Sequence, residues 1–465
     1  MSDRKPVIIT EEQIEEQRQY IQQIRLMPDA PKSYHVVTYG CQMNAHDSEI
    51  LAGMLRDMGM EEAADRESAD FVLFNTCCVR DNAERRALGN VTWLKEVRKK
   101  NPRLMIGVCG CMIQQPGMAE KILKQYRFVD LAFGTANLYR LPELMLKALE
   151  SDHAVVEVEE QNTIAEGLPV QRLRHDAAYI TIMYGCDNYC TYCIVPYVRG
   201  RERSRRPEEI VAEVKELIAA GYKDITLLGQ NVNSYGKDLG LGVDFADLLG
   251  ELAELPGEFW LRFMTSHPKD ATKKLFDTIA SHEKIAKQFH LPFQSGNDRV
   301  LKVMNRHYDS AQYLSLVDYG RSLMPGLVLT SDVIVGFPGE TEAEFEDTIR
   351  LIERVRYDAL FTFIFSPRPG TPAAKMDDPT PKEEKNRRFD RLCEVQNRIS
   401  QEIHQAYVGR TMRVLVDGKD GELLTARTEG GRLVRMTGPD CLLGQFAEAK
   451  ITGCTTWSLT GESVL

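Results

Sequence analysis

Three cysteines on one short segment have the spacing of a metal-binding loop. Cys186, Cys190 and Cys193 lie in GCDNYCTYC, which is a C-x3-C-x2-C pattern. Structural zinc is normally closed by four ligands, and only His175 lies near enough in sequence to supply a fourth. A [4Fe–4S] cluster held by three cysteines instead leaves one iron open. The spacing therefore predicts such a cluster; the alternatives are a zinc loop or cysteines packed as small apolar side chains.

An iron with an open position can chelate a small molecule through an amine and a carboxylate. S-adenosylmethionine carries both groups, and one electron passed to its sulfonium yields a 5′-deoxyadenosyl radical. The cofactor would supply this chemistry, and the protein would supply binding and orientation. We therefore treat Cys186, Cys190 and Cys193 as candidate catalytic residues as well as metal ligands.

A second group of cysteines follows three predicted strands nearer the N-terminus. Cys41 follows the first strand, Cys77 and Cys78 follow the second, and Cys109 and Cys111 follow the third. Because the carboxyl ends of neighbouring parallel strands meet at one edge of a sheet, thiols from the three loops should converge. One thiol from each loop would again give three ligands. The spacing does not choose within either pair, and buried free thiols are the alternative.

The elements that position these cysteines follow from the apolar pattern. Between residues 33 and 158, short apolar runs alternate with helical patterns, which predicts a doubly wound α/β domain. A second alternating series, from 177 to 366, has six predicted strands and indicates a partial (βα)6 barrel. The predicted strands are 35–40, 71–76, 104–110, 128–134 and 153–158, and then 179–185, 224–230, 259–264, 288–294, 327–337 and 359–365.

The two ends of the chain differ from this α/β pattern. The leader is rich in Glu and Gln, and we expect a mobile or loosely docked arm. The C-terminal apolar runs 413–418, 422–428, 432–438 and 446–453 are separated by turns with Gly, Asp and Pro, as in a small antiparallel β-barrel. The predicted organisation is a leader at 1–32, an α/β domain at 33–158, a barrel domain at 172–400 and a terminal β-barrel at 401–465.

Composition excludes several classes of protein. The 465 residues are 43% hydrophobic and 27% charged, which is typical of a globular protein and not of a collagen-like, disordered or membrane-spanning chain. No apolar run approaches the roughly 18 residues of a spanning helix, and the N-terminus has no apolar signal segment. We therefore expect a cytoplasmic protein without a membrane partner, in which cysteines serve metal binding or catalysis rather than form structural disulfides. The net charge of −10 gives no sign of a nucleic-acid partner.

Nine stretches of the chain resemble the radical S-adenosylmethionine methylthiotransferases, over residues 33–465. Within that family, they look like the bacterial branch that modifies N6-isopentenyladenosine in tRNA. The stretches are TYGCQMNAHDSE, NTCCVRDNAE, GCMIQ, GCDNYCTYCIVPYVRGRERSR, LLGQNVNSYG, TSHP, LPFQSGNDRVLKVMNR, DVIVGFPGETEAEFEDT and FSPRPGTPAA. Their number and order make a chance match untenable.

The resemblance implies which cysteines hold a second, auxiliary [4Fe–4S] cluster. The family's ligands fall on Cys41, Cys77 and Cys111, so that Cys78 and Cys109 are bystanders. It also implies a methylthiotransferase N-terminal domain, a radical S-adenosylmethionine domain and a C-terminal TRAM domain. One S-adenosylmethionine would methylate a sulfur at the auxiliary cluster, and a second would be cleaved to take hydrogen from C2 of the adenine at position 37, beside the anticodon. The product would be 2-methylthio-N6-isopentenyladenosine.

Polar residues and glycine at the ends of the barrel strands are candidates for binding S-adenosylmethionine. Barrel active sites are built at these strand ends, and an aromatic residue beside the cluster could flank the adenine. Simple strand-end capping, an ordinary turn or core packing would explain the same residues. The candidates are Tyr192, Gln230, Asn231, Gln294, Ser295, Asp332 and Gly336.

Two groups of arginines are candidates for contacts with the tRNA anticodon stem-loop. The first group crowds residues 199–206, directly after the candidate cluster loop, and the second lies on a predicted hairpin of the terminal barrel. A solvated face or internal salt bridges are the alternative. The candidates are Arg199, Arg201 and Arg203 in the first group, and Arg427, Arg432 and Arg435 in the second.

The resemblance also implies partners, and it leaves other functions to be tested. Turnover would need an electron donor of the flavodoxin or ferredoxin type and a sulfur supply, for which an iron–sulfur carrier protein is a candidate; we expect a monomer. The alternative functions are methylthiolation of an aspartate in ribosomal protein S12, methylthiolation of threonylcarbamoyladenosine in tRNA, and an iron–sulfur electron carrier with an RNA-binding tail. The S12 enzymes would carry a motif closer to LGCxKN than to the YGCQMN of residues 39–44.

Overall fold

The computed structural model describes residues 6–78, 81–159 and 163–464. The chain divides into two compact units. The first unit consists of Met1–Leu173, Met183–Tyr189 and Cys193–Arg205, and the second of Arg174–Ile182, Cys190–Tyr192 and Arg206–Leu465. Within the described part of the chain, no helix combines the length and the apolar character needed to cross a membrane.

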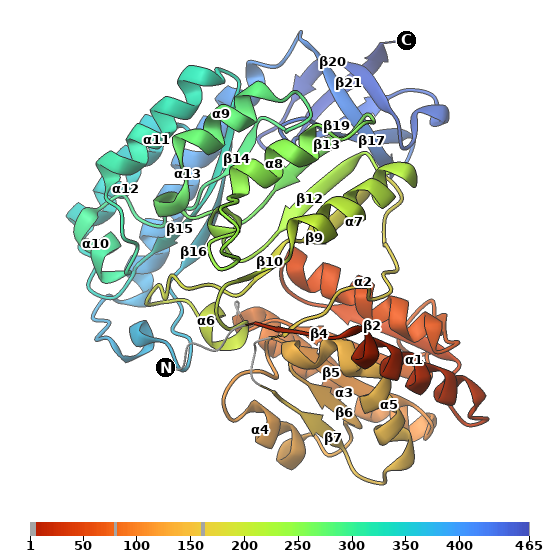
Figure 1. The fold of residues 1–465 in the computed structure, drawn as a ribbon. Coiled ribbons are helices and arrows are strands. Elements are labelled where there is room, and N and C mark those ends of the chain that lie inside the picture. The colour runs from red at the N-terminus through yellow and green to blue at the C-terminus, as the bar shows by residue number, and fades with distance from the viewer. Residues whose placement is uncertain (1–5, 79–80, 160–162, 465) are drawn as a thin grey trace. The chain divides into compact units, whose positions relative to one another are not determined.

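A six-stranded sheet in which every pair is parallel runs through the first unit (Figure 1), with the order β3-β2-β4-β5-β6-β7. The predicted strands of the N-terminal domain are confirmed, and the short edge strand β3 adds to them. The strands are β2 (Ser33–Thr38), β3 (Glu61–Glu62), β4 (Phe71–Thr76), β5 (Met105–Gly110), β6 (Leu131–Phe133) and β7 (Val155–Glu157). Outside this sheet, β1 (Val7–Ile8) pairs with β8 (Thr163–Ile164), and β10 (Met183–Tyr184) with β11 (Arg203–Ser204).

Helices cover both faces of this sheet, as a doubly wound fold requires. In β4, Phe71 and Leu73 pack with α1, α2 and α5, whereas Val72 and Phe74 pack with α3 and α4. Successive side chains of a strand point to opposite faces, so a fully apolar strand needs cover on both sides. The helices are α1 (Glu11–Leu26), α2 (Gln42–Asp57), α3 (Asp81–Lys100), α4 (Met118–Gln125), α5 (Leu141–Glu150) and the short α6 (Val195–Val198).

Residues Glu11–Leu26 of the leader form a docked helix, so the prediction of a mobile or loosely docked arm was wrong for this part, while residues 1–5 lie outside the described residues. Helix α1 begins with a capping box, in which the Thr10 side chain accepts from the Gln13 N–H and the Gln13 side chain accepts from the Thr10 N–H. Ile14, Ile21 and Ile24 are buried, and the helix packs on α5. These isoleucines recur with the helical period, a signal that the polar composition of the segment obscured.

Six parallel strands of the second unit form the predicted partial barrel. Two three-stranded sheets, β9-β12-β13 and β14-β15-β16, are joined by a parallel bridge between Leu261 and Ile285. The strands are β9 (Ala177–Thr181), β12 (Asp224–Leu228), β13 (Trp260–Phe263), β14 (Gln288–His290), β15 (Val328–Val335) and β16 (Ala359–Ile364). The surrounding helices are α7 (Pro207–Ala219), α8 (Phe245–Ala253), α9 (Lys273–Ser281), α10 (Asp298–Val303), α11 (Ser310–Leu323) and α12 (Glu342–Val355).

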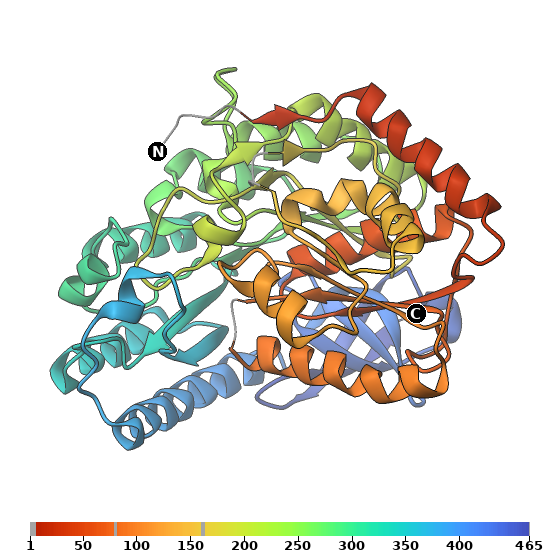
Figure 2. The ribbon, with the colours of Figure 1, turned by 90° about the horizontal axis from the view of Figure 1, so that it is seen from below.

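A closed five-stranded barrel with the order β17-β18-β19-β21-β20 completes the second unit. All pairs are antiparallel except β19 with β21, and β21 is a strand that the apolar pattern did not predict. Figure 2 shows the long helix α13 (Lys382–Gln405) leading toward this barrel. The strands are β17 (Thr411–Asp420), β18 (Leu423–Thr428), β19 (Leu433–Thr437), β20 (Phe446–Cys454) and β21 (Leu459–Val464).

Candidate functional site

The N-terminal cysteines lie at the point where the strand order of the first unit reverses. The chain moves from β2 outward to β3 and then crosses to β4, so the switch point lies between β2 and β4. Open α/β sheets bind ligands in the crevice at this point, outside the carboxyl ends of the strands. Cys41 is the N-cap residue of α2, Cys77 directly follows β4, and Cys111 directly follows β5. The predicted auxiliary set, Cys41, Cys77 and Cys111, therefore occupies the part of the sheet where a ligand is expected.

Asn44 joins the three cysteine loops. Its buried side-chain amide donates to the carbonyl oxygens of Tyr39 and Thr76, at 2.9 Å each. Its Oδ1 atom accepts from the Sγ atoms of both Cys41 and Cys111, at 3.9 Å each. The Cys77 side chain lies directly against the backbone of Gly40. A Cβ atom built on Gly40 would lie 2.5 Å from Cβ of Cys77.

The two remaining cysteines of this group have apolar surroundings. Cys109 points into the core that α1, α2 and α5 share with the sheet, and burial raises the pKa of its thiol well above the usual value. Cys78 packs with Ile194 and Val198 next to Cys111, and burial raises its pKa in the same way. Among the described residues, no group of three or more His, Cys, Asp or Glu side chains is arranged to hold a metal ion as it stands.

Arg199 is buried against the auxiliary set, although the sequence predicted a contact with RNA phosphate. It is 5% exposed. Its Nε atom donates to Sγ of Cys111 at 3.2 Å, and its Nη2 atom donates to Oδ1 of Asn44 at 2.9 Å and to Oδ2 of Asp47 at 2.6 Å. Burial raises the pKa of the Cys111 thiol to about 12, and the Arg199 charge opposes that rise. A guanidinium held in this way does not reach a phosphate at the surface.

Burial also argues against Arg203 as a phosphate ligand. Its Nε donates to the Thr163 carbonyl oxygen at 2.9 Å, and its guanidinium lies over the Tyr184 ring. Arg205, from the same run, is buried in an ion pair with Glu166. Arg201 differs, because its side chain is 59% exposed beside Asp187.

The terminal barrel separates its arginines in the same manner. Arg432 is buried in an ion pair with Asp358, and burial lowers its pKa to about 10, so in this structure its guanidinium is not at the surface. Arg427 and Arg435 keep side chains that are 43% and 39% exposed, beside Asp417 and Asp420. These two, with Arg201, remain candidates for RNA contacts.

The candidate ligands of S-adenosylmethionine lie at the carboxyl ends of the second unit's strands. Asn231 follows β12, and Gln294 and Ser295 follow β14. Gln294 has φ of +66° and forms a parallel bridge with Val333 of β15. Its backbone N–H donates to the carbonyl oxygen of Asp332 at 2.9 Å, so the ends of β14 and β15 are held together. Gln230 precedes Asn231 and is partly buried.

Several side chains at these strand ends keep a buried polar atom with no hydrogen-bond partner in the described part of the chain. An unpaired buried polar group costs about 1–3 kcal/mol, so a cluster of them calls for a polar ligand. The atoms are Oδ1 of Asn231, both amide atoms of Asn233, Oγ of Ser266, Nε2 of His267 and Oε1 of Gln294. Burial lowers the pKa of His267 far below its usual range, which keeps the ring neutral.

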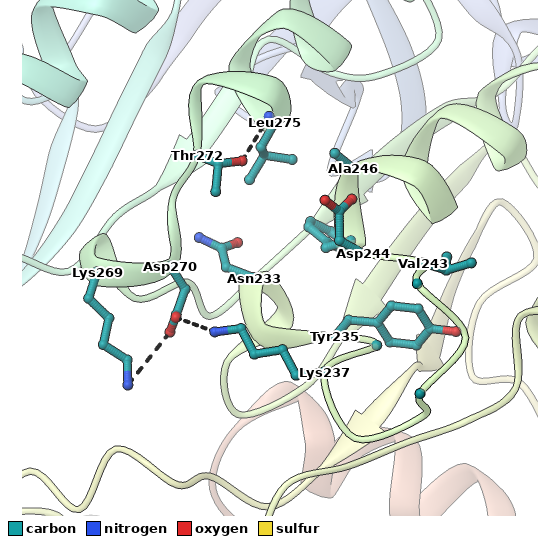
Figure 3. A pocket seen from close by; sticks show the side chains of 14 residues that line it. Asn233, Tyr235, Lys237, Val243, Asp244, Ala246, Lys269, Asp270, Thr272 and Leu275 are labelled. Atoms are coloured by element: carbon teal, nitrogen blue, oxygen red, sulfur yellow. Dashed lines mark hydrogen bonds and ion pairs between the residues drawn. The ribbon is translucent and has the colours of Figure 1, made fainter.

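Asn233, Ser266 and His267 were not among the predicted site residues. Their signal was present in the sequence, because LLGQNVNSYG begins with the last two residues of β12 and TSHP follows β13. Figure 3 shows Asn233 above Asp270, which accepts from Lys237 Nζ at 2.5 Å and lies 4.0 Å from Lys269 Nζ. Asn233, Lys237, Lys269 and Asp270 help to line a hollow of about 400 Å³ beside the strand ends.

Cys190, a member of the radical set Cys186, Cys190 and Cys193, lies next to a buried cation of the second unit. Nη1 of Arg306 donates to Sγ of Cys190 at 3.4 Å, and Nη2 donates to the Pro292 carbonyl oxygen at 2.8 Å. Tyr192 packs against the apolar cluster around Phe337 and Phe365, and its hydroxyl accepts from Arg306 at 3.4 Å. This packing agrees with the core alternative for Tyr192 and leaves its contact with an adenine untested.

The Gly336 backbone has a partner within the protein. Its N–H donates to Oε2 of Glu340 at 2.7 Å, its φ is +70°, and a Cβ there would meet the Lys385 side chain. Burial raises the pKa of the Glu340 carboxyl to about 7. The glycine is therefore required by a turn and by a packed lysine, which agrees with the ordinary-turn alternative.

Three sequence families match this chain. The radical SAM superfamily matches residues 180–352, the uncharacterized protein family UPF0004 matches residues 33–134, and the TRAM domain matches residues 405–464. The radical SAM methyltransferase TsrM from Kitasatospora setae, solved with tryptophan and an S-adenosylmethionine analogue, superposes with a TM-score of 0.55 at 15% identity. That likeness covers 84% of this chain and 79% of the other, and it concerns the fold alone.

Curated relatives match from end to end. One from Alkaliphilus oremlandii is 48% identical over all of both chains, and one from Clostridium botulinum is 50% identical over 93% of this chain and 97% of its own. Both are named tRNA-2-methylthio-N(6)-dimethylallyladenosine synthase. Fold, domains and strand-end cysteines together define an enzyme of the radical S-adenosylmethionine methylthiotransferase type. The chain belongs to the family of the tRNA-2-methylthio-N(6)-dimethylallyladenosine synthases, and the radical SAM superfamily implies a [4Fe–4S] cluster and S-adenosylmethionine.

Proposed function

We propose that this protein methylthiolates C2 of N6-isopentenyladenosine at position 37 of tRNA, using two [4Fe–4S] clusters. The full-length similarity to enzymes of that name supports the substrate. The observation that carries the two-cluster reaction is the convergence of Cys41 and Cys111 on one amide oxygen, with Cys77 packed against the Gly40 side of the same crevice. A single-cluster radical enzyme has no use for a second cysteine set at a switch point.

Each set offers the donor chemistry of the group assigned to it, because cysteine thiolates are the usual ligands of iron–sulfur clusters. Cys186, Cys190 and Cys193 would hold the radical cluster, and Cys41, Cys77 and Cys111 the auxiliary one. Bound S-adenosylmethionine supplies the radical chemistry and the methyl group. The side chains of Asn231, Gln294 and His267 would hold it by donating and accepting hydrogen bonds at their unpaired atoms, since its amine, carboxylate and ribose provide matching groups. The neutral His267 ring adds no cation to a site for a sulfonium.

The RNA would bind over the exposed arginines. Arg201, Arg427 and Arg435 keep exposed guanidinium groups that could pair with backbone phosphates. The target adenosine lies in a single-stranded loop, so extruding it into a pocket costs only a few kcal/mol. We infer that the enzyme acts as a monomer in the cytoplasm. Because the reaction consumes electrons and sulfur, a flavodoxin or ferredoxin would supply the electrons and an iron–sulfur carrier the sulfur.

The test is anaerobic incubation of reconstituted protein with isopentenylated anticodon stem-loop RNA, dithionite and S-adenosylmethionine, followed by nucleoside mass spectrometry. We expect a methylthio mass gain on the isopentenyladenosine nucleoside. An RNA of the same sequence that lacks the isopentenyl group is the matched control. A gain on ribosomal protein S12 or on threonylcarbamoyladenosine, with none on this RNA, would refute the assignment.

A further inference from the structure

Arg199 has a combination of contacts that a surface-binding arginine would not have. The residue ends helix α6 and is buried in the first unit, where Nε points at the sulfur of Cys111 and Nη2 bridges Asn44 and Asp47. Asp47 is itself 5% exposed. A buried cation is costly unless it is paired and fully hydrogen-bonded, and among the described residues this one is paired with a single carboxylate, that of Asp47. Folding energy alone would be served as well by apolar side chains of similar volume.

The sulfur contact indicates which state of Cys111 the arginine accommodates. A protonated thiol is a weak acceptor, whereas a metal-bound cysteine is deprotonated and accepts charge-assisted hydrogen bonds. The Nε–Sγ distance of 3.2 Å places the donor at the sulfur of a proposed auxiliary ligand. Asn44 contacts the same guanidinium and the thiols of Cys41 and Cys111. The three side chains of Arg199, Asn44 and Asp47 therefore form one network behind two of the three proposed ligands.

We propose that Arg199 is a positioning residue that tunes the auxiliary cluster. Its N–H group holds the Cys111 sulfur in the ligating orientation, and its fixed positive charge raises the cluster's reduction potential. Hydrogen bonds to ligand sulfurs and nearby charge are two of the factors that set the potential of an iron–sulfur cluster. Asp47 holds the guanidinium in place and limits the size of the effect. The inference rests on the proposed auxiliary cluster.

The second unit contains a comparable contact at a cysteine of the other set, where buried Arg306 donates to Sγ of Cys190 at 3.4 Å. The loop of Arg199 also offers a matched control. Arg205 is a buried arginine six positions along the chain, and its guanidinium pairs with Glu166. Arg199→Gln and Arg205→Gln therefore each remove one buried guanidinium from the same segment, but only the first removes the donor at Cys111.

The experiment uses the full chain with Cys186, Cys190 and Cys193 replaced by alanine, so that only the auxiliary cluster can assemble. Iron content and the midpoint potential from an EPR-monitored redox titration are measured for this background, for Arg199→Gln, Arg199→Lys and Arg205→Gln. We expect Arg199→Gln to shift the midpoint to a more negative potential, Arg199→Lys to shift it less, and Arg205→Gln to leave it unchanged. Loss of auxiliary iron in Arg199→Gln alone would equally support the holding role.

Two results would overturn the inference, and they are distinguishable from each other. If Arg199→Gln and Arg199→Lys keep the iron and the midpoint of the background, Arg199 does not act on the cluster, while the proposed function stands. If the alanine background itself binds no iron, the auxiliary cluster is absent and the proposed function fails together with the inference.

Discussion

The side-chain amide of Asn231 donates a 2.7 Å hydrogen bond to the carboxylate of Asp270. This contact fixes the direction of the amide and leaves its oxygen buried and without a partner among the described residues. Asp270 also accepts from Lys237, so the carboxylate joins the β12 and β13 strand ends through two donors. Asp270 therefore orients the unpaired Oδ1 atom of Asn231 toward a ligand that Asp270 itself need not touch.

Replacing Asp270 by alanine should weaken binding of S-adenosylmethionine about tenfold. A hydrogen bond to a charged group is worth about 1.5 kcal/mol, and a tenfold change in Kd corresponds to about 1.4 kcal/mol. Lys237→Met is the control, because it leaves the Asn231–Asp270 bond intact. Anaerobic calorimetry of the reconstituted variants gives the two Kd values. Wild-type affinity in Asp270→Ala would show either that Asn231 does not need Asp270 to orient its amide or that Asn231 does not bind the cofactor.

Cys77→Ala should lose the auxiliary cluster, whereas Cys78→Ala should keep it. Cys77 faces the Gly40 turn in the crevice, but Cys78 packs with Ile194 and Val198. The iron and sulfide content of each reconstituted variant tests this prediction. Cys186→Ala serves as the reference. It should lose only the radical cluster, and with it all formation of 5′-deoxyadenosine. Loss of one cluster in Cys78→Ala with retention in Cys77→Ala would reverse the ligand assignment.

Arginines of the terminal barrel should fall into two classes. Arg427→Ala and Arg435→Ala should weaken tRNA binding and each reduce the slope of log K against log salt by about 0.7–0.9, the amount expected for one lost phosphate contact. Arg432→Ala should instead destabilise the fold by about 3–5 kcal/mol, because it leaves Asp358 as a buried unpaired charge. Filter binding at several salt concentrations and urea unfolding separate the classes. Unchanged stability in Arg432→Ala, with loss of tRNA binding, would contradict this division.

Glu340 should make stability fall as the pH rises. The folded-state pKa of its carboxyl is raised to about 7 by burial, above its ordinary value of 4.5, so the folded state holds the proton more tightly. Stability then declines between these two values and levels off above pH 7. From pH 6 to pH 8 the loss amounts to about 1.4 kcal/mol.

Urea unfolding at pH 6 and pH 8 tests this. Glu340→Gln should remove the decline, and Glu353→Gln, at an exposed position on α12, should retain it. An equal decline in wild type and Glu340→Gln would assign the pH dependence to another group.

Local sequence pattern determined much of this protein. The doubly wound domain, the six barrel strands and the terminal β-barrel follow from apolar periodicity, because strands buried on both faces must be continuously apolar and turns must carry Gly, Asp or Pro. Spacing and position after strands singled out the two groups of cysteines, and the family resemblance chose Cys41, Cys77 and Cys111 within the N-terminal group. The docked helix α1 and strand β21 were missed, since a sparse isoleucine stripe in a polar segment and a short half-polar strand carry little local signal.

Tertiary structure decided what each polar side chain does. Arg199, Arg201 and Arg203 are equivalent as residues of one basic run, yet only Arg201 is exposed. Whether a guanidinium reaches phosphate, a carbonyl oxygen or a cysteine sulfur depends on burial and on partners that are distant in sequence: Asp47 lies 152 residues from Arg199, and Asp358 lies 74 residues from Arg432. The sequence determined which chemical groups are present and after which strands they stand. The fold determined their partners, because the cost of burying a charge is offset only by contacts that form when the chain is folded.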